Sequence, residues 1–167
     1  MPVMLALAQP IRLDDVLIVQ GEWGRVEEIT GTYVVMKIWD ERRLIIPLQW
    51  FIENPFQNWT RTSAQIHQAV YLFVDFATPL EPLRAELQRI VEAAEEWDGR
   101  TVQLKVTDGT ERAMKLRALV SSRAAGPAFD LGCKVREGLF AFMAREYPQY
   151  LPQVRGTALQ AGEAASP

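Results

Sequence analysis

The segment from Asp15 to Arg61 constrains the fold most, because it alternates short apolar runs with breaks at glycine and proline. Apolar and other residues alternate over 32–39, so that Val34, Met36 and Ile38 share one face of a strand. Several short strands that bend at glycines favour a sheet closed on itself, because closure removes exposed strand edges. The sequence therefore predicts a five-stranded, Sm-like or OB-like β barrel over residues 11–62.

The predicted turns of this barrel are marked by four residues, Gly21, Gly24, Gly31 and Pro47. Gly21 and Gly24 bracket a tight connection after a first strand, and Gly31 lies in the next turn. Pro47 ends the fourth strand, because proline has no N–H to donate to a strand ladder. A single helical turn over 48–53 and a fifth strand within 55–61 complete the predicted unit.

After residue 62 the pattern changes to longer elements. A strand over 65–76 is followed by Thr78-Pro79-Leu80-Glu81, a capping box that predicts a helix start. Apolar residues then recur at spacings of three and four up to Trp97, and Asp98-Gly99 is expected to end this helix. A hairpin turning at 107–110 and a second helix between Gly126-Pro127 and Pro148 follow.

This β-α-β-β-α order is most of a ferredoxin-like split unit. The chain is therefore expected to be an α+β protein, with a ferredoxin-like α/β domain over residues 63–155. Residues 151–157 are a candidate for the last strand of that unit, and this assignment stays open. The small, polar segment 156–167 is expected to be disordered.

The apolar segment at residues 1–10 is too short to cross a membrane. Fewer than ten residues precede Pro10, and a helix of that length rises about 14 Å, against about 30 Å of bilayer hydrocarbon. The chain is therefore expected to be soluble.

Composition argues against an enzyme, a metal site and a nucleic-acid partner. Cys133 and His67 are the only cysteine and histidine, so a Cys/His metal site and an intrachain disulfide are not expected. The adjacent carboxylates Asp14 and Asp15 are expected to be solvated rather than paired. The formal net charge is −3, which gives no basic footprint for nucleic acid. We expect no catalytic residues and no cofactor.

The aromatic residues of the first unit exceed what the interior of a small barrel needs. A bulky core, a protein–protein interface and a base-stacking surface would each explain them. The interface explanation predicts that aromatic anchors lie between subunits. The residues expected there are Trp23, Trp50, Phe51, Phe56 and Trp59.

Residues 9–61 resemble the segment that follows the pore helix in the small-conductance mechanosensitive channel (MscS) family. The shared pattern is a Pro-Ile-Arg entry, then G-x-x-G-x-V-x-x-I, then W-D-x-R-x-L-I-x-P. Residues 130–152, DLGCKVREGLFAFMAREYPQYLP, resemble the C-terminal α/β part of the same family. One departure is Leu48, where many members have asparagine. The matching positions are Gly21, Gly24, Val26, Ile29, Trp39, Asp40, Arg43, Leu44, Ile45 and Pro47.

The resemblance implies a module of the cytoplasmic cage of a mechanosensitive channel. Seven subunits would assemble below a pore on the cytoplasmic side of a bacterial inner membrane, and ions and osmolytes would pass in response to membrane tension. The transmembrane helices would be missing from this chain, residues 1–10 being the remnant of the pore-helix end. No nucleic acid is expected, although a small-barrel nucleic-acid-binding module is the alternative and an enzyme a third hypothesis.

Overall fold

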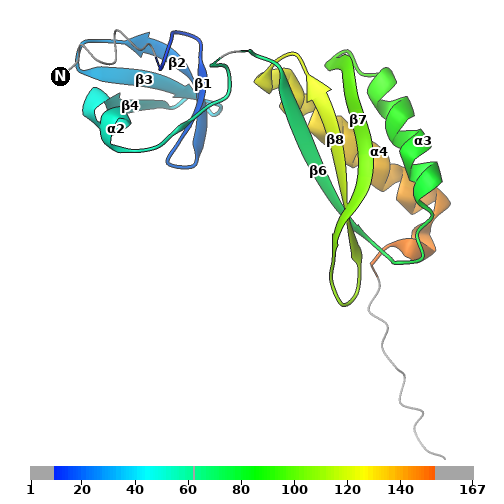
Figure 1. The fold of residues 1–167 in the computed structure, drawn as a ribbon. Coiled ribbons are helices and arrows are strands. Elements are labelled where there is room, and N and C mark those ends of the chain that lie inside the picture. The colour runs from blue at the N-terminus through cyan, green and yellow to red at the C-terminus, as the bar shows by residue number, and fades with distance from the viewer. Residues whose placement is uncertain (1–9, 62, 153–167) are drawn as a thin grey trace, which may run out of the picture.

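The computed structural model describes residues 10–61 and 63–152, which form two sheets, each with its own apolar core (Figure 1). Three predicted segments lie wholly or mostly outside the described residues. They are the remnant of a pore helix at residues 1–10, of which only Pro10 is described, the candidate last strand at 151–157 and the tail at 156–167. The mixed α and β content and the antiparallel pairing agree with the predicted α+β class.

The first sheet has five antiparallel strands in the order β4-β3-β2-β1-β5. Its core side carries Leu17, Val34 and Met36, each with no exposed surface. The alternation predicted for 32–39 is therefore confirmed, since Val34, Met36 and Ile38 all lie in this core. The elements of this unit are β1 (Val16–Val19), β2 (Glu22–Ile29), β3 (Tyr33–Ile38), β4 (Arg43–Pro47), α2 (Leu48–Glu53) and β5 (Gln57–Asn58).

The four predicted turn positions have different roles in this sheet. Gly21 lies between β1 and β2 with φ of +79°, a conformation that suits glycine. Gly31 lies in the bend between β2 and β3, and Pro47 is the last residue of β4. Gly24 was wrongly predicted to lie at a turn, because it lies inside β2, opposite Ile38 of β3.

Close packing of two strands explains the glycine at position 24. A Cβ there would lie 2.6 Å from the backbone oxygen of Lys37 and 2.8 Å from Cγ of Met36. No ordinary side chain fits this space, so β2 and β3 approach each other only because residue 24 has no side chain.

The second sheet has three antiparallel strands in the order β6-β8-β7, with α3 and α4 packed against it. Leucines and valines from the sheet and both helices share one core, including Leu72, Leu87 and Val135. The elements are β6 (Ile66–Val74), α3 (Leu80–Glu92), β7 (Trp97–Gly109), β8 (Met114–Ser122), α4 (Ala125–Glu146) and the 3₁₀ turn η1 (Pro148–Tyr150).

The ends of α3 differ from the prediction. The helix begins after Pro79, and no side chain caps it; the Thr78 hydroxyl is buried without a hydrogen-bond partner, so the predicted capping box does not form. The helix also ends at Glu92 rather than at Asp98-Gly99. Trp97 belongs to β7, where its indole N–H donates to the Thr101 carbonyl at 3.1 Å. Trp97 fitted the apolar spacing of the predicted helix because it packs against the same core as α3, although it does so from a strand.

We predict that Gly24→Ala destabilises the protein by roughly 1–3 kcal/mol, because the new methyl group would force β3 away from β2. Urea denaturation of the purified chain measures this change. Gly31→Ala is the matched control, since nothing lies within 4 Å of a Cβ at that position and its φ is not positive. Equal stability of the two variants would contradict the packing argument.

Candidate interaction surface

The structure separates the five aromatic residues predicted to form an interface. Trp50, Phe51 and Phe56 form one group around α2, in which the Phe51 ring contacts the other two edge-to-face at centroid distances of 5.4 and 4.9 Å. Phe51 is only 6% exposed, and Trp50 and Phe56 pack against the same core. Phe51 is therefore a core residue, and its assignment to the interface was wrong: the turn of α2 directs its ring inward.

Trp23 and Trp59 lie elsewhere, on the side of the first sheet that faces away from its core. Trp23 on β2 is opposite Ile18 of β1, which is in turn opposite Gln57 of β5. The Trp59 indole N–H donates to Oε1 of Gln57 at 3.1 Å. Both tryptophans are half-buried.

Trp39 extends this row and was not among the predicted interface residues. It directly follows Ile38, the partner of Gly24, so continuing the register places it opposite Trp23. Trp39 is 74% exposed, the most exposed of the large apolar side chains in the described residues. The signal was present in the sequence, because the alternation over 32–39 puts Trp39 on the outer face. We call Trp23, Trp39 and Trp59 the tryptophan row.

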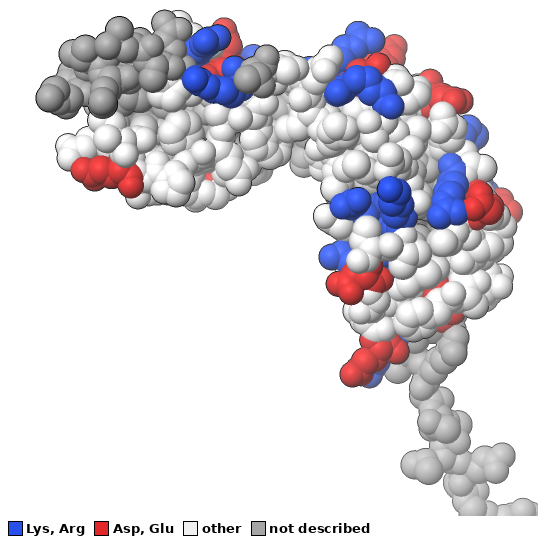
Figure 2. Space-filling view, viewed as in Figure 1, with Lys and Arg blue, Asp and Glu red and all other residues white. Residues whose placement is uncertain are grey.

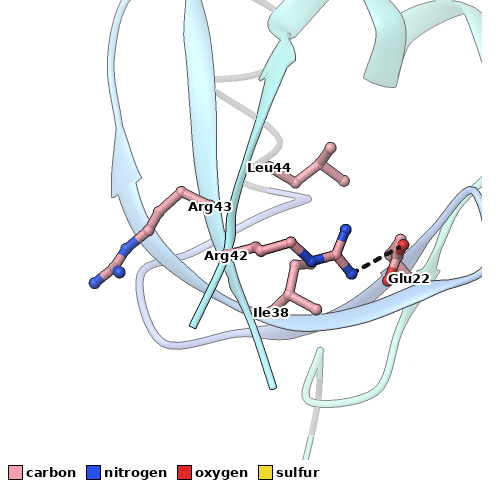
Figure 3. A pocket seen from close by; sticks show the side chains of 5 residues that line it. All are labelled: Glu22, Ile38, Arg42, Arg43 and Leu44. Carbon is pink, nitrogen blue, oxygen red and sulfur yellow. Dashed lines mark hydrogen bonds and ion pairs between the residues drawn. The ribbon is translucent and has the colours of Figure 1, made fainter. Parts of the chain in front are cut away.

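A shallow hollow of about 250 Å³ lies beside the hairpin between β3 and β4, lined by Glu22, Ile38, Arg42, Arg43 and Leu44. Figure 3 shows Arg42 reaching across it toward Glu22, whereas Arg43 points to the other side of the strand. Arg42 also donates to Asp40, and this hydrogen bond holds the pKa of Asp40 below its ordinary value. These are exposed ion pairs, which contribute little stability. They fix the hairpin that carries Trp39.

A buried carboxylate holds the two ends of the first unit together. Asp15, predicted to be solvated, is only 8% exposed. Its side chain accepts hydrogen bonds from the Arg12 backbone N–H at 2.8 Å, the Asn58 amide at 2.9 Å and the Thr60 hydroxyl at 2.7 Å. The segment before β1 and the strand β5 are thereby joined, which also positions Trp59 between Asn58 and Thr60.

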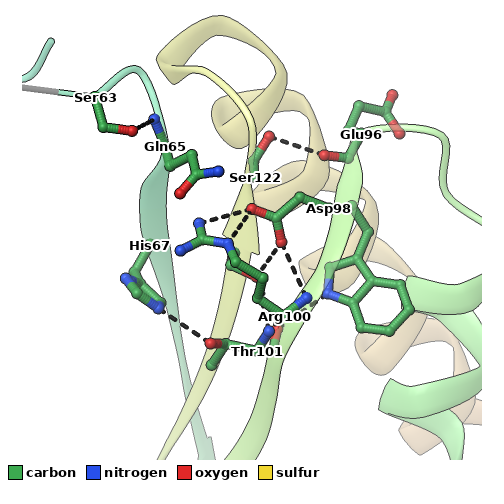
Figure 4. Close-up of polar contacts among 10 residues, drawn as sticks. Ser63, Gln65, His67, Glu96, Asp98, Arg100, Thr101 and Ser122 are labelled. Carbon is green, nitrogen blue, oxygen red and sulfur yellow. Dashed lines mark hydrogen bonds and ion pairs between the residues drawn. The ribbon is translucent and has the colours of Figure 1, made fainter.

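A polar network occupies one end of the second sheet (Figure 4). The Asp98 carboxylate accepts from the Ser121 hydroxyl at 2.5 Å and from Arg100 Nε at 2.7 Å. Burial raises the pKa of Asp98, but the hydrogen bonds from Ser121 and Arg100 outweigh it and hold this pKa below its ordinary value. His67 contacts Thr101 Oγ1 at 3.1 Å rather than the serine, so His67 and Asp98 bind different hydroxyl groups.

This network has a structural role, since it shapes the irregular start of β7. The pairing of β7 with β8 shifts between Trp97 and Val102, where Asp98 turns inward.

Within residues 10–61 and 63–152, no group of three or more histidine, cysteine, aspartate and glutamate side chains could hold a metal ion. No helix in those ranges is long and apolar enough to cross a lipid bilayer.

Comparison with known families gives a match over the first unit. Residues 3–61 match the family model described as mechanosensitive ion channel, beta-domain. This confirms the resemblance seen in the sequence. Comparison with curated protein sequences finds no significant match.

Solved structures match nearly the whole chain in fold. The crystal structure of Helicobacter pylori MscS in its closed state aligns over 97% of this chain with a TM-score of 0.76 and 13% identity. The cryo-EM structure of Arabidopsis thaliana wild-type MSL1 aligns over 92% with a TM-score of 0.62 and 11% identity. The chain spans 63% and 54% of the lengths of those two proteins.

We predict that Asp98→Asn lowers the free energy of unfolding at neutral pH by roughly 1–3 kcal/mol, because a buried hydrogen-bonded carboxylate is lost. A carboxyl whose pKa is lower in the folded state than in the unfolded state stabilises the folded state at pH values above its unfolded pKa, near 3.9. This contribution disappears as the pH falls through the folded-state pKa. The difference from wild type should therefore shrink below about pH 4. Denaturation across pH tests this, with Asp130→Asn, an exposed site on α4, as control. A constant difference at all pH values would contradict it.

Proposed function

Because residues 3–61 carry a β-domain of the mechanosensitive ion channel family, we propose that this chain is the cytoplasmic cage module of an MscS-like channel. Seven copies would surround the inner mouth of a pore, and ions and osmolytes would reach the pore through the cage when membrane tension opens it. The family match over the first unit carries this proposal. The shared fold along 97% of the chain supports extending it to the second unit.

The domain division fits a cage built from two rings. The first unit, residues 11–62, has five antiparallel strands in one sheet, which supports a small barrel. The second unit, residues 63–155, has the strand order β6-β8-β7 with two helices packed against it, which supports a ferredoxin-like unit.

The tryptophan row is the surface of the first unit best suited to contact a neighbouring subunit. Tryptophans are enriched at the centres of protein interfaces, where their large apolar area is removed from water. Trp39 leaves most of its ring in solvent in the single chain, so this apolar area is available to a partner. Of the residues first assigned to the interface, Trp23 and Trp59 remain in this proposal, whereas Trp50 and Phe56 form a separate group around α2 that packs against the core.

The channel role is tested by expressing the complete gene that encodes this chain in a bacterial strain without mechanosensitive channels. The proposal predicts that cells survive a sudden fall in external osmolarity, because tension opens the channel and osmolytes leave. A protein that reaches the membrane but gives no protection would contradict the channel role.

We predict that Trp39→Ser weakens self-association of the chain roughly tenfold while leaving its melting temperature unchanged, because the side chain is an exposed anchor. Analytical ultracentrifugation and thermal denaturation measure the two quantities. Phe129→Ser on α4, which also removes an exposed aromatic ring, is the matched control and should change neither.

Phe51, a buried aromatic residue of the first unit, should affect stability rather than association. Phe51→Ala is expected to lower the free energy of unfolding by about 3–5 kcal/mol.

If the Trp39→Ser variant associates as strongly as wild type, the proposed interface is contradicted.

A further inference from the structure

The second sheet has one face without a covering layer. Helices α3 and α4 pack on the side that carries Val70, Leu72 and Leu116, all of which are buried. The next residues along the strands point to the opposite side, which we call the open face. Figure 1 shows both helices on one side of this sheet and none on the other.

The open face combines aromatic rings with cations. Tyr71 on β6 is opposite Arg117 on β8, which is opposite Lys105 on β7. One step along, Phe73 is opposite Lys115. Tyr71 and Phe73 are each 47% exposed. Figure 2 shows blue side chains gathered across the middle of this sheet.

The cations of the open face lack anionic partners in the described part of the chain. No ion pair joins Lys105, Lys115 or Arg117 to a carboxylate there, whereas Arg84, Arg89 and Lys134 on the helices each have one. Asp108 is opposite Lys115, but its carboxylate accepts the Gly109 backbone N–H. Like charges directly opposite each other on a sheet are destabilising, so Lys105 and Arg117 form a costly pair.

The acidic counterpart lies on the other side of the same domain. Glu92 ends α3 and Glu95 follows it, and both are exposed. Within the described residues neither forms a direct ion pair; Gln88 donates to Glu92 at 2.5 Å, and Lys134, paired with Glu96, also attracts Glu95. Carboxylates at the C-terminal end of a helix are disfavoured by the helix dipole, so a cationic partner would stabilise this end.

We propose that the open face of one copy docks the acidic end of α3 of a second copy, with Lys105, Lys115 and Arg117 facing Glu92 and Glu95. The two surfaces lie on opposite sides of one domain, so the contact is head-to-tail. Contacts of this kind build rings or open filaments rather than two-fold dimers. The inference rests on the proposed function, since it names the surfaces through which the second units of a cage would meet.

The rings of the open face favour a protein partner over a nucleic acid. Base stacking needs a free aromatic face. Here the Lys115 ammonium lies over the Tyr71 ring at 4.5 Å from its centroid and 5.9 Å from that of Phe73. The rings thus hold a cation in place, which suits a carboxylate arriving from a neighbour.

Charge reversal of each surface tests the proposal on the purified chain. Lys105→Glu with Lys115→Glu reverses the open face, and Glu92→Lys with Glu95→Lys reverses the helix end. Each double variant should associate roughly a hundredfold more weakly than wild type in analytical ultracentrifugation at low salt, because like charges would meet. Arg112→Glu with Arg123→Glu is the control: it makes the same charge change as the open-face variant, at exposed positions just beyond the two ends of β8, and should leave association unchanged.

Two recombinations separate a direct contact from a general charge effect. The fourfold variant carries a negative open face and a positive helix end, so it should regain wild-type association. A mixture of the two double variants should also associate, because each surface of one meets its opposite on the other. That mixture can close a ring only with an even number of copies, whereas the fourfold variant can close a ring of any number.

The proposal is overturned if the double variants associate as wild type does, if the fourfold variant stays as weak as they do, or if the wild-type chain remains monomeric at millimolar concentration and low salt. It is also overturned if the open face binds a single-stranded oligonucleotide and the same reversals abolish that binding alone. Osmotic protection by the complete gene is measured separately, so a channel that protects cells without this contact would leave the proposed function standing.

Discussion

The approach of β2 to β3 at Gly24 is the constraint on which the first unit depends. The backbone oxygen of Lys37 occupies the space where any other residue would place its Cβ. The missing side chain lets β2 and β3 pair closely beside Met36, which shares one core with Leu17 and Val34. Trp23 and, by continued register, Trp39 lie on the other side of the same two strands. The close approach at one glycine therefore supports both the core and the tryptophan row.

A second constraint closes the unit at its ends. Asp15 joins the segment before β1 to Asn58 of β5 and to Thr60 just after it, and also accepts the Arg12 backbone N–H. A buried carboxylate is costly unless its acceptors are satisfied, and here backbone, amide and hydroxyl donors all reach it. These bonds add to the two paired positions of β1 and β5 and to the bond from Trp59 N–H to the Val16 carbonyl. The buried polar residues at this end of the first unit thus serve to join its strands.

Local pattern was enough to predict much of the fold. The alternation around Met36 and the proline that ends β4 located β3 and β4, because both signals act within a few residues. The same logic failed where a distant partner decides the outcome. The pattern placed Asp98 at the end of a helix, but Ser121 and Arg100 hold it in β7. Phe51 was predicted to be a surface anchor, whereas α2 turns it inward. Trp39 was omitted from the predicted interface, although the alternation over 32–39 already put it on the outer face.

The central proposal is that this chain forms part of the tension-gated path of an MscS-like channel. The most direct measurement is current across an excised membrane patch that carries the product of the complete gene. The account predicts discrete current steps that appear when suction stretches the patch and that vanish on release. A patch that contains the assembled protein but shows no tension-dependent current would contradict it.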